Sequence, residues 1–99
     1  MSKIDRHKNI CDHIHEVYIS KNHDYGDSFG KSIAEFGPIA GVVRMEDKMN
    51  RIKSLIKKGG DQKVTDESMK DTLLDLANYA IMLSMELDDT GDEKNTIKQ

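Results

Sequence analysis

The chain has 99 residues, which is enough for one domain with one modest hydrophobic core. Charged residues make up 33% of it and the net charge is -3, so we expect no broad surface for binding polyanions, although a local basic patch is compatible with these values. Cys11 is the only cysteine, which excludes an intramolecular disulfide. No signal peptide or membrane-spanning run is apparent, and we expect a cytoplasmic protein that does not enter a membrane.

The sequence predicts an all-α fold, a small helical bundle of three long helices and one short one. Glycines divide the chain, and no alternating run rich in Val, Ile or Thr predicts a strand. The first helix is expected over residues 4–21. On its apolar stripe we expect His7 and Cys11 to be core side chains rather than zinc ligands. The stripe residues recur at steps of three and four: Ile4, His7, Cys11, Ile14 and Tyr18.

The stretch KNHDYGDSFGKS, residues 21–32, is predicted to be a loop, followed by a short helix near residues 32–36. Ser28 or Ser32 would cap that helix. One interpretation is a ligand loop, in which an aromatic ring stacks on a base and polar groups bind sugar or phosphate. The alternative is an ordinary connection between helices. The candidate nucleotide-binding residues of the loop are His23, Asp24, Tyr25 and Gly26.

The second helix is predicted to begin at Gly37-Pro38, because proline suits a first helical turn, and to end at Gly59. Its expected core stripe is Val42, Met45, Met49, Ile52 and Ile56.

The third helix is predicted to begin at Thr65 or Asp66, and it carries acids among apolar residues. Its expected core stripe is Met69, Leu73, Leu76, Ala80, Leu83 and Leu87. The roughly opposite side holds Glu67, Asp71, Asp75, Asn78 and Met82. Apolar residues flank these acids, so we expect both sides of the helix to be covered. One side would pack in its own subunit, and the other would meet either a partner chain or the first half of the protein. A homo-oligomer would complete the bundle. The acids would then line an enclosed polar site at or near an interface.

A simpler interpretation of the acids is that they form ion pairs. Asp71 would pair with a cation of the second helix, which supplies Arg44, Lys48, Arg51 and Lys53. The expected single domain covers residues 1–88, and the polar tail 89–99 is expected to be flexible.

Three stretches, HDYGDSF, RMEDKMNRIKSL and DESMKDTLLDLANYAIM, together resemble the nucleotide modification associated domain family of bacteriophages and prophages. The resemblance spans about residues 21–87. The residues that carry it are the Asp24-Tyr25-Gly26 loop, Lys48, Arg51, Ile52, Glu67 and Asn78-Tyr79. The resemblance implies a role in phage nucleotide metabolism or base modification, in the host cytoplasm if the chain is phage-encoded.

The chain is more distantly similar to all-α NTP pyrophosphatases of the MazG and dimeric dUTPase type. In those enzymes, paired acids on two helices grip magnesium over a triphosphate. The corresponding metal ligands here would be Glu46, Asp47, Asp71 and Asp75. The pattern departs from that family: Thr72 stands three residues before Asp75, and Asn50 stands four residues after Glu46.

Nucleotide binding is therefore the favoured function, and whether the chain is an enzyme stays open. Binding would use Lys48 and Arg51 for phosphates, Tyr25 for the base, and Asp71 or Asn78 for base or ribose, with no cofactor required. Such a protein would sequester a nucleotide signal or serve phage nucleotide metabolism. The first alternative is a magnesium-dependent nucleoside triphosphate pyrophosphohydrolase, and the second is a non-catalytic helical adaptor. Specific DNA binding is not expected.

Overall fold

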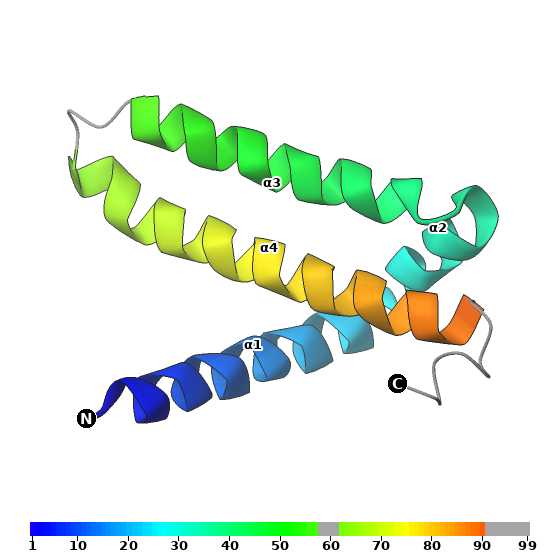
Figure 1. Cartoon of the computed structure of the whole chain (residues 1–99), viewed down its shortest axis with the longest axis horizontal. Helices are drawn as coiled ribbons and strands as arrows, with labels where there is room; N and C mark the ends of the chain where they lie inside the picture. The colour runs from blue at the N-terminus through cyan, green and yellow to red at the C-terminus, as the bar shows by residue number, and fades with distance from the viewer. Residues whose placement is uncertain (58–61, 91–99) are drawn as a thin grey trace.

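The computed structural model describes residues 1–57 and 62–90, apart from the side chains of 62–67 and 89–90. It consists of α1 (Lys3–Tyr25), α2 (Ser28–Phe36), α3 (Ile39–Lys57) and α4 (Gln62–Thr90). The all-α class, with three long helices and one short one, is confirmed. Helices α3 and α4 run antiparallel, α1 approaches α4 towards its own C-terminal end, and α2 joins α1 to α3 at that end (Figure 1). Among the described helices, none is long and apolar enough to cross a membrane.

The predicted loop over residues 21–32 is wrong, because only Gly26 and Asp27 separate α1 from α2. No residue before Gly26 breaks the helix, so α1 continues through Tyr25. It ends at Gly26, whose φ of 68° is a conformation that favours glycine. Asp27, rather than Ser28 or Ser32, caps α2: its Oδ1 accepts a hydrogen bond from the Gly30 N–H at 3.1 Å.

The beginning of α3 agrees with the predicted proline signal. The Pro38 carbonyl accepts hydrogen bonds from the Gly41 and Val42 N–H groups, at 2.9 and 3.2 Å. The predicted end of this helix at Gly59 lies outside the described residues. The predicted start of α4 at Thr65 or Asp66 is wrong, because the helix begins at Gln62. It runs to Thr90, and the predicted tail lies outside the described residues beyond that point.

The core is small, and it includes residues that are not apolar or have no side chain. Its buried apolar residues are Ile14, Ile33, Ile52 and Leu55, and Thr72 is only 3% exposed. Leu83 of α4 packs so close to Gly41 of α3 that a Cβ on Gly41 would meet its Cδ1 at 3.0 Å. On α3 the side turned inward is Gly41, Met45, Lys48, Ile52 and Leu55. The predicted stripe is therefore partly wrong, because Val42, Met49 and Ile56 are exposed.

The predicted core stripe of α4 is also partly wrong, although its members Met69, Leu76 and Leu83 are half-buried. From the expected core stripe, Leu73 and Leu87 are each 46% exposed and Ala80 is exposed. Asp75 and Asn78, on the expected polar side, face other helices of the same chain, which agrees with the alternative that this side meets the first half of the protein. Similarly, His7 and Cys11 are exposed rather than core residues, with the Cys11 Sγ 3.8 Å from the His7 Nδ1.

Candidate functional site

A pocket of about 640 Å³ opens where all four helices meet. This volume lies within the range of small-molecule sites. Each helix contributes side chains spaced three or four residues apart, which places them on one face of that helix. They are Tyr18, Lys21, Asn22 and Tyr25 of α1; Ser28, Phe29, Ser32 and Phe36 of α2; Ile39, Ala40, Val43 and Arg44 of α3; and Asp75, Asn78, Tyr79 and Met82 of α4, with Gly26 and Asp27 between α1 and α2.

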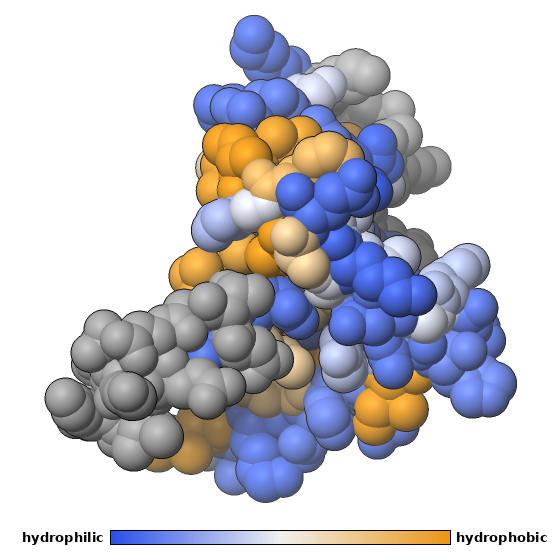
Figure 2. Space-filling view, turned by 90° about the vertical axis from the view of Figure 1, so that its right-hand side faces the viewer, coloured by the Kyte–Doolittle hydropathy of each residue, from blue (hydrophilic) through white to orange (hydrophobic). Residues whose placement is uncertain are grey.

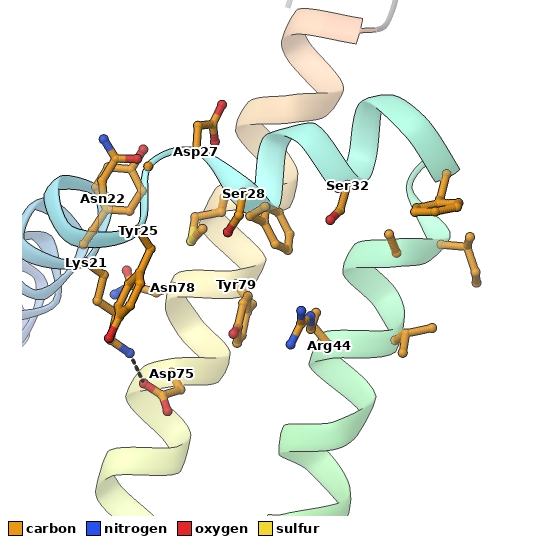
Figure 3. Close-up of a pocket in the computed structure, with 18 residues that line it drawn as sticks. Lys21, Asn22, Tyr25, Asp27, Ser28, Ser32, Arg44, Asp75, Asn78 and Tyr79 are labelled. Carbon is orange, nitrogen blue, oxygen red and sulfur yellow. Dashed lines mark ion pairs between the residues drawn. The ribbon is translucent and has the colours of Figure 1, made fainter.

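Asp75 forms one edge of the pocket and is engaged with two cations. Lys48 Nζ lies 3.1 Å from Asp75 Oδ2, and Lys21 Nζ lies 3.7 Å from Asp75 Oδ1. The Lys21 pair is drawn in Figure 3. Lys48 is the more enclosed of the two lysines, with 28% of its side chain exposed against 61% for Lys21. The carboxylate therefore joins α1, α3 and α4 and leaves Lys21 partly free to meet a ligand.

Arg44 reaches from α3 into the middle of the pocket, towards Tyr79 and Ser32 (Figure 3). Among the described residues its guanidinium forms no hydrogen bond or ion pair. A guanidinium placed in a pocket in this way presents a fork of donors suited to a carboxylate or a phosphate.

Aromatic rings line much of the remaining wall. The rings of Phe29 and Tyr79 pack with centroids 5.6 Å apart, and the Lys48 ammonium lies 6.0 Å from the centroid of Tyr79. Tyr25 is 74% exposed, so its ring is held at the rim rather than in the core. Such a ring has room for a planar group to stack on it.

The opposite end of the pocket is apolar and open. Phe36, Ile39 and Val43 are 64%, 60% and 51% exposed. In the end-on view, hydrophobic side chains gather over the end of the molecule where α2 meets α3 (Figure 2). The pocket thus has a charged end near Asp75 and an apolar end at the junction of α2 and α3.

Three of the candidate nucleotide-binding residues line this pocket: Tyr25, Gly26 and Asn78. The Gly26 N–H donates to the Asn22 carbonyl at 2.9 Å, so this amide is already used in the helix cap. Asn78 Nδ2 donates to the Ile14 carbonyl at 2.9 Å and so fastens α1 to α4.

The other candidates lie outside the pocket wall. His23 and Asp24 pair with each other at 3.4 Å, with side chains 87% and 60% exposed. Arg51 donates through Nε to Thr72 Oγ1 at 3.3 Å, and Asp71 is exposed. Lys48 does not line the pocket itself, although its ammonium bonds to Asp75 and lies near the ring of Tyr79. The predicted ion pair between an acid of α4 and a cation of α3 is therefore formed by Asp75 with Lys48, and not by Asp71.

The four candidate magnesium ligands are not brought together. Glu46 lies beside Val42 and Met49 in a separate groove, about 200° round α3 from Arg44. Asp47 and Asp71 are exposed, and Asp75 is held by lysines. In the part of the chain that the structure describes, no three His, Cys, Asp or Glu side chains form a group that could hold a metal ion.

Sequence reasoning missed Arg44 and Lys21 as pocket residues. The signal was present on α1, where Tyr18, Lys21, Asn22 and Tyr25 are spaced as one helical face. This helical face was overlooked because the sequence analysis predicted that the helix ends at residue 21 and that a loop follows.

The family model described as nucleotide modification associated domain 1 matches residues 21–87 of the chain. The matched span includes every pocket residue except Tyr18. The search of curated proteins and the search of solved structures found no match.

Proposed function

Because this chain belongs to the nucleotide modification associated domain 1 family, we propose that it binds a phosphorylated nucleotide in the pocket between its four helices. The observation that carries the proposal is the placement of the Arg44 guanidinium, unpaired among the described residues, at the centre of a pocket lined with aromatic rings. A nucleotide combines an anion with a planar base, which are the two chemical groups that such a wall accommodates.

In this proposal Arg44 holds the phosphate by charge-assisted, bidentate hydrogen bonds. Lys21 assists it, since its contact with Asp75 is long, at 3.7 Å, and most of its side chain is exposed. These two cations supply the positive charge, so binding requires no metal ion. The proposed phosphate ligands therefore differ from Lys48, whose Nζ bonds to Asp75, and from Arg51, whose Nε bonds to Thr72, and neither of these two residues lines the pocket.

The base stacks on Tyr25 at the rim, where the exposed ring can accept a planar partner. Asn78, although tied to Ile14 through its Nδ2, retains a side-chain carbonyl oxygen that accepts a hydrogen bond from a base or ribose. A protein that holds a nucleotide in this way sequesters a nucleotide signal or serves phage nucleotide metabolism, in the cytoplasm, which is that of the host cell if the chain is phage-encoded.

The experiment that tests the proposal is a mass-spectrometric screen of nucleotides retained by the purified protein, with and without magnesium. Intact nucleotide retained in both conditions is the expected result. Conversion of a nucleoside triphosphate only when magnesium is present would favour the pyrophosphohydrolase alternative. Retention of no nucleotide at all would favour a non-catalytic adaptor.

A further inference from the structure

The outer side of α4 is an apolar face that no other part of the described chain covers. Leu73 and Leu87 are each 46% exposed and Ala80 is exposed. At about 100° per residue, Leu73 and Ala80 lie about 140–160° round the helix from Asp75, which lines the pocket. This face is therefore separate from the proposed nucleotide site. We call the exposed residues Leu73, Ala80, Ser84 and Leu87, with the half-buried Ala77, the outer face of α4.

The order of large and small residues along this face is symmetric. Leu73 and Leu87 stand seven residues before and after Ala80, which is about two helical turns in each direction. The small residues Ala77 and Ser84 lie between each leucine and the centre. A helix with this pattern is complementary to an antiparallel copy of itself, because two-fold symmetry places residue i against j and residue j against i.

We propose that the outer face of α4 binds the same face of a second copy of this chain, antiparallel, about a two-fold axis near Ala80. Each Leu73 then packs against Leu87 of the second copy, and the small residues at the centre let the two helices approach closely.

Exposed charges at the two ends of the face agree with this pairing. Lys70 lies ten residues before Ala80 and Asp88 lies eight residues after it, on the same side of the helix. Antiparallel pairing brings Lys70 near Asp88 of the second copy, and the two-fold axis produces this contact twice. A parallel arrangement would bring like charges together at each end instead.

The available area is also sufficient. A groove beside the outer face adds Val42 and Met49 of α3, which are 46% and 41% exposed, together with Leu76 of α4. The stretch of α4 from Lys70 to Thr90 is about 30 Å long, and two adjacent helices are about 20 Å wide, which gives roughly 600 Å² per copy. The resulting total of roughly 1,200 Å² meets the lower limit for a specific, stable interface.

A cysteine at the proposed axis provides the test. Ala80→Cys is made in a Cys11→Ser background, and the protein is oxidised at micromolar concentration. Two thiols on the axis lie close enough to bond, so we expect a disulfide-linked dimer within minutes. His13→Cys in the same background is the matched control, because His13 is exposed on α1, away from the proposed axis. It should link far more slowly.

Light scattering and far-UV circular dichroism on Leu73→Glu provide the second measurement. The wild type should be a dimer, and Leu73→Glu should raise the dimer dissociation constant at least about thirtyfold while the helical content stays unchanged. If Leu73→Glu fails to fold, the cross-linking rates of Ala80→Cys and His13→Cys still show whether the dimer forms. A monomeric wild type, or Ala80→Cys linking no faster than His13→Cys, overturns the proposal, whether the face then stays free or is covered by another molecule.

Discussion

Lys48 and Asp75 form an ion pair, with Nζ and Oδ2 3.1 Å apart, that joins α3 to α4 at the edge of the pocket. Lys21 of α1 approaches the second oxygen of the same carboxylate at 3.7 Å. One acid therefore holds two cations from two different helices at the proposed nucleotide site.

Neutralising Asp75 distinguishes two models: one in which cationic side chains bind the phosphate, and one in which a magnesium ion held by acids binds it. Asp75→Asn should cost on the order of 1 kcal/mol of unfolding free energy, because two ion pairs are lost. Nucleotide affinity should be kept or increased, since a negative charge near the phosphate is removed and the two lysines are released. Calorimetric titration, with magnesium and with chelator, measures this. Asp71→Asn is the control, because Asp71 is exposed one turn away on the same helix. Metal-dependent binding that Asp75→Asn abolishes would instead favour the pyrophosphohydrolase.

Tyr25→Ala should weaken nucleotide binding without changing stability. Loss of a base–aromatic stack costs on the order of 1–3 kcal/mol, or up to about a hundredfold in affinity. The ring is 74% exposed, so little packing is lost and the melting temperature should stay nearly constant. Fluorescence titration and thermal denaturation test the two parts. His23→Ala, two residues earlier with its side chain 87% exposed, should leave affinity unchanged. Equal affinities of both variants would remove Tyr25 from the site.

Asn78→Ala should loosen α1. The Asn78 amide donates to the Ile14 carbonyl at 2.9 Å, and this bond fastens α1 to α4. Its loss should cost about 1 kcal/mol. Amide hydrogen exchange should then become faster chiefly in α1. Nucleotide affinity should also fall, because α1 carries Lys21 and Tyr25. Asn50→Ala, at an exposed position on α3, is the control. An exchange pattern for Asn78→Ala that matches this control would contradict the proposed role of the bond.

Gly41→Val should destabilise the α3–α4 contact. A Cβ at this position would lie 3.0 Å from Leu83 Cδ1 and 3.2 Å from Phe29 Cζ, so a branched side chain overpacks the site. The expected cost is about 1–3 kcal/mol, measured by urea denaturation. Ala34→Val, on an exposed position of α2, introduces the same branched side chain without that crowding and should cost much less. Equal losses in both variants would show that Gly41 is not crowded.

The helices could be predicted from the sequence more reliably than the direction in which they face. Glycines and Pro38 marked the breaks between helices, so their number and rough position were correct. Apolar periodicity predicted only part of the inward side of α3 and α4, because the core there also uses Gly41, the buried hydroxyl of Thr72 and the half-buried Lys48. None of these three residues counts as apolar in a sequence pattern. In addition, an apolar face that a second copy covers has the same spacing of apolar residues in the sequence as a core stripe. The leucines of α4 therefore suggested a core on its outer face.

The lining of the pocket was predicted only in part, for a related reason. Tyr25 and Asn78 were named as candidates and line the pocket, whereas the predicted phosphate ligands Lys48 and Arg51 do not line it and Arg44 does. All three cations lie on α3, and spacing alone does not show which of them meets an internal acceptor. Only tertiary packing reveals that Asp75 and Thr72 engage Lys48 and Arg51.

Arg44→Ala and Arg51→Ala, compared with each other, show whether Arg44 holds the phosphate. The two arginines are seven residues apart, about two turns, on the same side of α3, and both variants lose the same charge. Nucleotide affinity is measured by calorimetry for each. Arg44→Ala should lose about 1.5–3 kcal/mol, or roughly tenfold to a hundredfold in affinity, because its bonds to the phosphate are charge-assisted. Arg51→Ala should bind as the wild type does. Nucleotide affinity lost in Arg51→Ala and kept in Arg44→Ala would place the phosphate outside this pocket and contradict the proposed role of Arg44.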